Sequence, residues 1–214
     1  MTSSIKRRSI VLSFVLLAIT TFHSYGQLSI QSAQIGLKGG GNFYKIGGRS
    51  FENKTYPSFT AGAYAELNFT PQWSLQPELS WSETIAETGD QFNVNYPGAV
   101  TSKLYSNYIS LPVMIAFKPV PELSILLGPQ FDYLVTQTTG VLPPTYNNKD
   151  VFSKVDVGIV FGGQLNLGKV KVGARYFVGL NNVNGINTTD TWKVHGFQLY
   201  VGYQLWDLKM KKKK

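Results

Sequence analysis

The amino-acid sequence predicts an all-β fold, namely an eight-stranded antiparallel up-and-down transmembrane β-barrel with short periplasmic turns and longer external loops. Three observations lead to this prediction. Apolar and polar side chains alternate with a period of two over eight segments. The connections between these segments alternate between short and long. Glycines recur on the polar face of the segments, where the solvated face of a soluble sheet would carry charged side chains and threonine.

The alternating segments each have about the ten residues that a tilted strand needs to cross a bilayer. They lie at about residues 33–44, 57–69, 73–83, 106–118, 122–136, 153–166, 169–180 and 195–206. No amphipathic helical period of useful length follows the N-terminal region. The chain after that region is therefore expected to form strands and their connections.

The stretch WSLQPELSWSE at residues 73–83 illustrates the choice that the pattern leaves open. One of its faces is apolar with a tryptophan at each end, Trp73 and Trp81, and the other is small and polar around Glu78. In a soluble barrel the apolar face would point inward. In a membrane barrel it would face lipid.

The lengths of the connections favour the membrane barrel. The second, fourth and sixth connections are the short sequences TPQ, PVPE and LG. The other four are long, at residues 45–56, 84–105, 137–152 and 181–194. Outer-membrane barrels have tight periplasmic turns at one end and longer loops at the other.

Glycines on the polar face also favour the membrane barrel. They are Gly36, Gly40, Gly62, Gly128, Gly158, Gly162, Gly173 and Gly179. An eight-stranded barrel has an interior just wide enough for side chains to fill, so small residues must alternate with large ones such as Tyr64, Phe177 and Tyr200. We therefore place the polar face in the lumen and expect the sheet to close, because lipid cannot pair a free edge. Pro77 and Pro129 each lack a backbone donor, and we expect local bulges there.

Aromatic side chains gather at both ends of the apolar face. Phe69, Trp73 and Phe117 flank the short turns, whereas Phe59, Trp81 and Tyr133 lie near the long loops. This distribution predicts two aromatic belts at the two lipid–water interfaces.

The N-terminus has the features of a secretory signal. The basic residues Lys6, Arg7 and Arg8 precede the apolar run 10–19, and the sequence HSYGQ follows with a cleavage site before Gln27. We therefore predict a signal peptide at 1–26, the barrel domain at 27–206 and a basic tail at 207–214. A buried N-terminal helix is the alternative reading. The predicted location is the outer membrane of a Gram-negative bacterium.

Most of the net charge of +8 comes from the two ends of the chain. Without the three basic residues of the signal, the five lysines of the tail and Asp207, 12 basic and 11 acidic residues remain. A nearly neutral body gives no indication of nucleic-acid binding. The lysine run is read as a solvated tail, with a contact to anionic lipid or a cloning remnant as alternatives. The absence of cysteine excludes disulfides and zinc–thiolate sites.

Several short stretches, together and in order, make the chain resemble the PorT-type outer-membrane β-barrel proteins over nearly the whole mature length. They are GLKGGGN at 36–42, LQPEL at 75–79, GPQ at 128–130, DVG at 156–158 with Gly162, and ARY at 174–176 followed by Gly179-Leu180. Two features depart from the family. Ser110 stands where a glutamate is common, and eight residues follow Trp206, where such barrels usually stop at or near an aromatic residue.

The resemblance implies an eight-stranded barrel with both ends in the periplasm. It also implies that the assembly machinery, which reads the last strand, meets an unusual C-terminus. Some members of the family are linked to a protein secretion system, and most have no defined role.

Charged residues of the polar face are expected to point into the lumen. They are Lys38, Glu66, Glu78, Asp132, Lys154, Asp156, Lys171 and Arg175. One reading is a charged interior that plugs the barrel or lines a thin water path. The other, which we favour, is a structural ion-pair network, because buried charges are retained when they are paired. Glu78, Arg175 and Lys38 are the best candidates for its members.

Catalytic, metal and cofactor sites are not predicted. His195 is the one histidine after the signal, and nothing in the sequence places a nucleophile or an orienting group beside it. No histidine or carboxylate spacing suggests a metal. The Gly39-Gly40-Gly41 run lacks the following helix and the Lys-Ser/Thr pair of a phosphate loop.

The function expected from these observations is non-enzymatic. The leading hypothesis is a closed barrel with a structural or docking role at the cell surface. The alternatives are a narrow passive pore for ions or small solutes, an accessory component of a protein secretion system and, last, an enzyme. The long loops hold Tyr, Asn, Thr and Gly, which are able to bind a glycan or a protein partner, although ordinary hydrophilic loops are the favoured reading. The other expected partners are outer-membrane lipid and the barrel assembly machinery.

Overall fold

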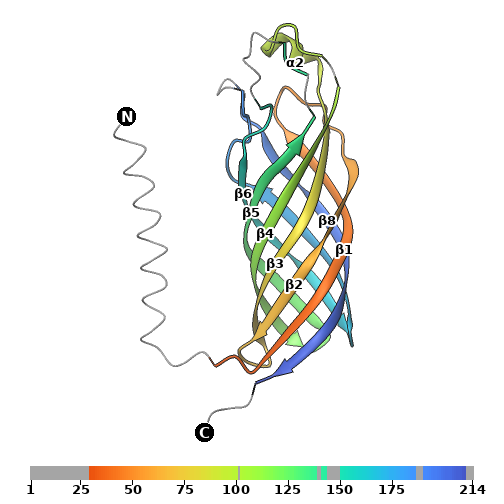
Figure 1. Ribbon diagram of the computed structural model, residues 1–214, viewed down its shortest axis with the longest axis vertical. Helices are drawn as coiled ribbons and strands as arrows, with labels where there is room; N and C mark the ends of the chain where they lie inside the picture. The colour runs from red at the N-terminus through yellow and green to blue at the C-terminus, as the bar shows by residue number, and fades with distance from the viewer. Residues whose placement is uncertain (1–28, 101, 139–140, 144–149, 187–189, 211–214) are drawn as a thin grey trace, which may run out of the picture.

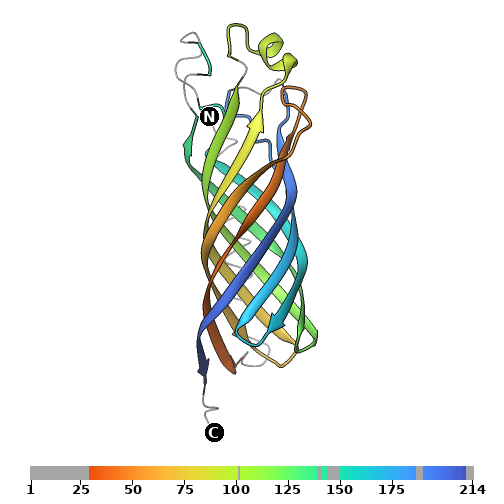
Figure 2. The ribbon, with the colours of Figure 1, turned by 90° about the vertical axis from the view of Figure 1, so that its right-hand side faces the viewer.

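The computed structural model describes residues 29–100, 102–138, 141–143, 150–186 and 190–210. These residues form one closed antiparallel barrel in which each strand pairs with the next and β8 pairs with β1 (Figure 1). The strands are β1 (Ser32–Gly47), β2 (Tyr56–Asn68), β3 (Trp73–Glu87), β4 (Lys103–Val120), β5 (Leu123–Gln137), β6 (Val155–Leu167), β7 (Val170–Gly179) and β8 (Lys193–Lys209). They are strongly tilted against the long axis of the barrel (Figure 2). The predicted fold class is confirmed.

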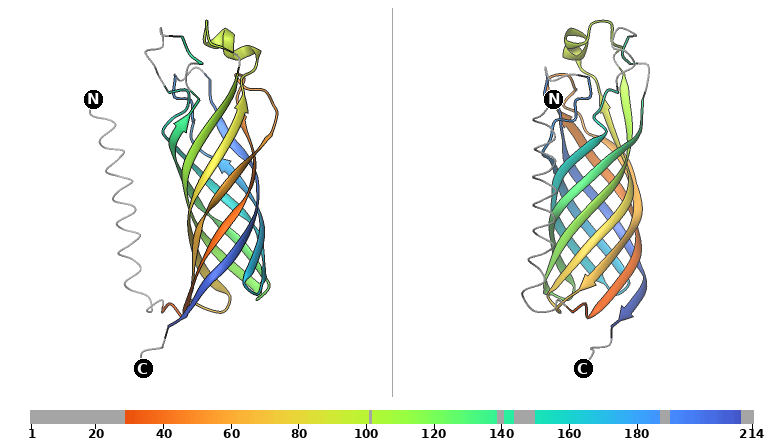
Figure 3. Two further views of the ribbon diagram at one scale, coloured as in Figure 1. Left: turned by 45° about the vertical axis from the view of Figure 1, so that its right-hand side comes forward. Right: turned by 60° about the vertical axis from the view of Figure 1, so that its left-hand side comes forward.

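Each of the eight predicted segments corresponds to one strand. The short turns lie together at one end of the barrel and the long connections at the other, where the strands project into a group of loops (Figure 3). Several strands are longer at the loop end than the sequence pattern indicates, for example β3, which reaches Glu87. The loop between β3 and β4 contains α2 (Asp90–Asn95), a short helix that the sequence pattern does not predict.

The apolar face of the sheet points outward, as predicted. Leu79 is 57% exposed on this face, and Phe197 and Val201 are similarly exposed. Their neighbours in sequence point into the lumen and are buried, among them Glu78 and Tyr200. The exterior is therefore an apolar surface suited to lipid, whereas the interior is polar.

Inward-facing glycines make room for the large side chains of the lumen. A Cβ atom added at Gly173 would lie 2.6 Å from Cε1 of Tyr200, and one added at Gly36 would lie 2.6 Å from Cε1 of Tyr64. Both distances are far below van der Waals contact. The predicted alternation of small and large residues is therefore confirmed, and it follows from the narrow interior.

The bulges that we expected at Pro77 and Pro129 are absent. The β3–β4 ladder pairs Pro77 with Val113 and resumes at Ser80 and Ser110 in the same register. Pro129 pairs with Ile159 in an unbroken β5–β6 register. A proline thus removes one donor from the ladder without an inserted residue. Register shifts occur elsewhere, at 35/36 between β1 and β8 and at two places between β4 and β5.

The six aromatic residues of the predicted belts lie on or near the outer surface. Phe59, Trp73, Trp81 and Tyr133 are exposed, whereas Phe69 and Phe117 are partly buried. The rings of Trp73 and Phe117 pack together across the β3–β4 pair with centroids 4.8 Å apart. Their role at the lipid–water interfaces stays a prediction.

Of the two expected limits of the barrel domain, the N-terminal one lies outside the described residues and the C-terminal one lies within β8. The predicted signal peptide at 1–26 lies outside the described residues. At the C-terminus, β8 continues three residues beyond the expected end at 206, and Leu208 is paired with Ala33 of β1. Within the described residues, no helix has the length and the apolar character needed to cross a membrane.

Candidate functional site in the barrel lumen

The lumen contains polar layers stacked along the barrel axis. The layer next to the periplasmic turns is centred on Glu66 of β2, which forms close ion pairs with Lys118 of β4 and Lys171 of β7. Ser74 donates a hydrogen bond to the same carboxylate at 3.2 Å. The Lys171 ammonium also lies over the Tyr64 ring, 4.8 Å from its centroid. One carboxylate and two ammonium groups thus close the periplasmic side of the lumen.

The middle layer joins the three charges that we ranked highest. Glu78 Oε2 accepts hydrogen bonds from Lys38 at 2.5 Å and from Arg175 at 2.8 Å. Glu78 Oε1 accepts a third from Gln76 at 2.9 Å. Both cations also lie over the ring of Tyr200, with Lys38 4.3 Å and Arg175 5.3 Å from its centroid. The side chains of Lys38, Glu78 and Arg175 are at most 2% exposed, so these ion pairs are enclosed and separated from bulk water.

A neutral layer follows toward the external end. Asn42 donates hydrogen bonds to Ser82 Oγ at 2.9 Å and to the Glu83 carbonyl at 3.0 Å. Its own Oδ1 accepts a hydrogen bond from Gln198 at 2.5 Å. This layer links β1, β3 and β8 across the lumen.

Asp132 and Asp156 form the uppermost polar layer and do not join the ion-pair network. They face each other as partners in the β5–β6 ladder. Gln130 donates to both oxygens of Asp132, at 2.9 and 3.0 Å. Within the described residues, neither aspartate has a basic group within 4.0 Å.

Two lysines correct the predicted set of lumen charges. Lys154 does not point into the lumen, because it lies before the start of β6 and is exposed. Lys118 belongs to the lumen but was missed, since it lies at the periplasmic end of β4, beyond the apolar run. Lys118 lies an even number of residues from the buried Met114 and Ala116, so the alternation along β4 places all three on the same, inward face. This was the signal that could have identified it.

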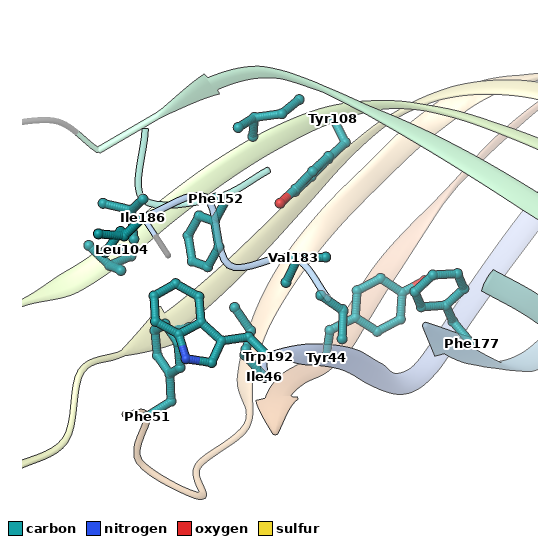
Figure 4. Close-up of a cluster of buried hydrophobic side chains, with 14 of the residues drawn as sticks. Tyr44, Ile46, Phe51, Leu104, Tyr108, Phe152, Phe177, Val183, Ile186 and Trp192 are labelled. Atoms are coloured by element: carbon teal, nitrogen blue, oxygen red, sulfur yellow. The ribbon is translucent and has the colours of Figure 1, made fainter. Parts of the chain in front are cut away.

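An aromatic cap covers the external end of the lumen. We use this name for Phe51, Phe92, Tyr96, Phe152 and Trp192, which come from the four external loops. The rings of Phe51 and Trp192 lie 4.8 Å apart, those of Phe92 and Tyr96 4.9 Å, and those of Phe152 and Trp192 6.0 Å. Below them the cluster continues through Val183 and Ile46 to Tyr44 and Phe177 inside the barrel (Figure 4).

Asp190 ties the aromatic cap together. Its Oδ2 accepts hydrogen bonds from the Ser50 hydroxyl at 2.7 Å, the Ser50 backbone at 3.1 Å and the Trp192 indole at 3.0 Å. Burial alone would raise the pKa of the Asp190 carboxyl, but these hydrogen bonds hold it below its ordinary value. The loops are thus more than the ordinary hydrophilic loops that we favoured, since Phe92 and Tyr96 are buried rather than available to a ligand.

Comparison with protein families identifies the barrel. The sequence profile described as "Outer membrane protein beta-barrel domain" matches residues 25–185, more than half of the chain. The chain belongs to this family. It is accordingly a protein of the cell outer membrane, embedded in lipid through its strands.

Solved structures of small outer-membrane barrels are similar to this one. Ail of Yersinia pestis, solved with the heparin analogue sucrose octasulfate, is 15% identical, with a TM-score of 0.45 over 81% of this chain and 98% of that one. The neisserial surface protein NspA is 12% identical, with a TM-score of 0.44 over 82% and 97%. OprG of Pseudomonas aeruginosa is 9% identical, with a TM-score of 0.43 over 81% and 94%. Comparison with curated protein sequences gives no match.

His195 of this outer-membrane barrel lies at the external rim. It is half-buried on the outer face of β8, opposite Lys45 of β1. In the part of the chain that the structure describes, no hydrogen bond joins His195 to a carboxylate or hydroxyl, and Asp190 is occupied by Ser50 and Trp192. The same residues contain no group of three or more His, Cys, Asp or Glu placed to hold a metal ion.

Proposed function

We propose that this outer-membrane barrel is a closed, non-enzymatic protein with a structural or docking role at the cell surface. The observation that carries the proposal is the combination of the Lys38–Glu78–Arg175 network with the aromatic cap above it. Because a narrow lumen leaves no second route, a solute would have to break these contacts to pass.

The energetics of the network support a closed lumen. Separating a buried ion pair leaves charges unpaired, which costs roughly 3–5 kcal/mol for each pair. The periplasmic Glu66 cluster adds a second barrier of the same kind. A passive pore for ions or small solutes would need these side chains to rearrange.

The external end supports a docking role. The aromatic cap is a small hydrophobic core of its own, which packs the described parts of the four external loops against one another. A rigid loop surface binds a partner at a lower cost in entropy than a mobile one. A protein or glycan partner at the external loops therefore remains our proposal.

Three further parts of the proposal rest on the sequence. The chain is exported by the signal at 1–26, matures into a barrel that starts at 27, and is inserted by the barrel assembly machinery. The stretches GLKGGGN and LQPEL support membership of the PorT-type group within the wider family. That membership would allow an accessory role in a protein secretion system.

The test is the conductance of the refolded protein in a planar bilayer. A folded barrel should run faster on SDS gels before boiling than after, whether or not its lumen conducts. This shift therefore confirms the fold of each sample. We expect a silent bilayer from folded protein. Steady openings would overturn the closed barrel and establish the pore.

The non-enzymatic part has its own test. The His195→Ala variant should keep the gel shift and any phenotype that the wild-type gene complements. Loss of that phenotype in a variant that keeps the gel shift would support the enzyme hypothesis.

A further inference from the structure

The uppermost polar layer places two buried carboxylates side by side, which is electrostatically unfavourable unless a positive charge lies between them. Asp132 and Asp156 are direct partners on neighbouring strands, and they are 7% and 2% exposed. Like charges directly opposite each other destabilise a sheet. A buried carboxylate that stays charged requires a partner of opposite charge or a coordinated metal, and it otherwise takes up a proton.

The basic side chains of the lumen are already engaged. Lys38 and Arg175 both bind Glu78, whereas Lys118 and Lys171 both bind Glu66. These two clusters hold four positive and two negative charges, and the uppermost layer holds two negative charges. The lumen is therefore charge-segregated along its axis, and its acidic end has no cation of its own among the described residues.

A cavity lies beside the aspartates. Its volume is about 10 Å³, which is roughly the room that one water molecule needs. The side chains that line it include Tyr44, Tyr108, Ser110, Gln130, Asp132 and Asp156. Apart from the amide nitrogen of Gln130, the polar side-chain atoms of these six residues are oxygens.

Among the described residues, three of these oxygens have no hydrogen-bond partner. The Gln130 amide group donates through Nε2 to Asp132, which fixes the orientation of the amide, and its Oε1 accepts no hydrogen bond. Gln130 is 3% exposed, so water outside the barrel does not reach it. Oδ1 of Asp156 and Oγ of Ser110 are likewise without a partner. Two carboxylates and a neutral amide oxygen around one small cavity are the ligands that hard cations prefer.

We propose that Asp132, Asp156 and Gln130 bind one oxygen-preferring divalent cation of the Ca²⁺ type inside the external half of the lumen, below the aromatic cap. A divalent ion balances the charge of the two aspartates. It also joins β5 to β6 below the long loop that connects them. The proposal is independent of whether the barrel conducts or docks a partner.

Terbium luminescence tests the site directly, because Tb³⁺ replaces Ca²⁺ and is excited by nearby tyrosines. Tyr44 and Tyr108 line the same cavity. The full barrel is refolded in detergent micelles with Tb³⁺ present, so that the cap does not limit entry, and is then freed of unbound ion. We expect sensitised emission from one bound ion per barrel, which Ca²⁺ displaces when it is present during refolding.

Variants identify the ligands. Asp156→Asn should abolish the emission, and Asp132→Asn should reduce it at least tenfold, because each removes a charged ligand. Glu122→Gln, at an exposed carboxylate of the periplasmic turn between β4 and β5, is the matched control and should leave the emission unchanged. Emission that survives in both aspartate variants, or no emission from folded wild-type protein, would overturn the proposal.

Unfolding distinguishes a bound cation from a proton shared between the aspartates. With a cation site, Ca²⁺ raises the urea midpoint of the wild type, read by the gel shift, and has no effect on Asp156→Asn. With a shared proton, Asp156→Asn raises the midpoint by itself and Ca²⁺ changes nothing. The second result would replace the cation site with a protonated pair.

Discussion

The hydroxyl of Ser50 donates a hydrogen bond to Asp190 Oδ2 at 2.7 Å, although 140 positions separate the two residues in the sequence. Ser50 follows β1 and Asp190 precedes β8, the two strands whose pairing closes the barrel. The Trp192 indole donates to the same carboxylate oxygen. The aromatic cap is thus tied at the seam where the barrel closes.

Acid should loosen the aromatic cap. The pKa of Asp190 in the folded protein lies below its ordinary value of 3.8, because the hydrogen bonds from Ser50 and Trp192 favour the charged form against the effect of burial. The stabilisation from this group is therefore present above the ordinary pKa and is lost as the pH falls through the folded pKa. We expect Trp192 to become more accessible to a fluorescence quencher only below about pH 4.

The measurement needs Trp192 as the single tryptophan, with the other three replaced by phenylalanine. In Asp190→Asn the acid transition should disappear, and the cap should already be looser at neutral pH. An equal transition in Asp190→Asn would assign the effect to another group.

Removing the central ring of the cap should open the loops without unfolding the barrel. Trp192 is fully buried and packs against Phe51, Phe92 and Phe152. Truncating a buried tryptophan costs about 3–5 kcal/mol. Because the strands are held by their own ladders, we expect Trp192→Ala to keep the gel shift but to be cut faster by trypsin at Arg49 and Lys54.

The matched control for this variant is Val94→Ala, since Val94 lies in the same group of loops and is 67% exposed. Its rate of cleavage should equal that of the wild type. Loss of the gel shift in Trp192→Ala would mean that the cap is required for the barrel itself.

The central network should respond unequally to loss of its members. Glu78→Gln leaves both Lys38 and Arg175 without a carboxylate, whereas Arg175→Ala leaves the Lys38–Glu78 pair in place. Breaking a buried pair costs roughly 3–5 kcal/mol. We expect both variants to lower the urea midpoint, with the larger fall in Glu78→Gln.

Lys154→Ala is the control for this series, because Lys154 is exposed and should leave the midpoint unchanged. A midpoint in Arg175→Ala equal to that of the wild type would contradict a stabilising network. Partial recovery in the double variant Glu78→Gln with Lys38→Met would confirm that unpaired charge is the cause.

The sequence was sufficient to predict the barrel, because period two assigns a face to every strand residue. It was insufficient to pair the charges. Lys38, Glu78 and Arg175 lie on β1, β3 and β7, which are not neighbours in the sheet. They meet across the lumen at a height that the strand tilt and the register set. The alternation of side chains along a strand predicts which residues point inward, but it specifies neither the tilt nor the register.

The aromatic cap was missed for a related reason. Phe51 and Trp192 stand singly in loops of polar residues, where no period marks them as buried. Only the closure of the barrel brings the four loops together. The bulges expected at the prolines were wrong because a ladder tolerates one missing donor in register.

Two glycines on opposite faces of the sheet should respond differently to the same added methyl group. Gly173 faces the lumen, where a new Cβ would lie 2.6 Å from Cε1 of Tyr200. Gly163 faces lipid, and the nearest atom to its new Cβ is the Ser124 carbonyl oxygen at 4.0 Å. We expect Gly173→Ala to destabilise the barrel by about 1–3 kcal/mol through overpacking. Gly163→Ala should instead be neutral or stabilise it by about 0.5–1 kcal/mol, since alanine loses less backbone entropy than glycine.

The urea midpoint of each variant, read by the gel shift, checks this pair. Equal midpoints would show that the lumen yields easily around Tyr200. A normal midpoint for Gly173→Ala combined with Tyr200→Leu, relative to Tyr200→Leu alone, would assign the cost to this one contact. The comparison therefore measures how tightly the interior is filled, which is the property on which the proposed closed lumen depends.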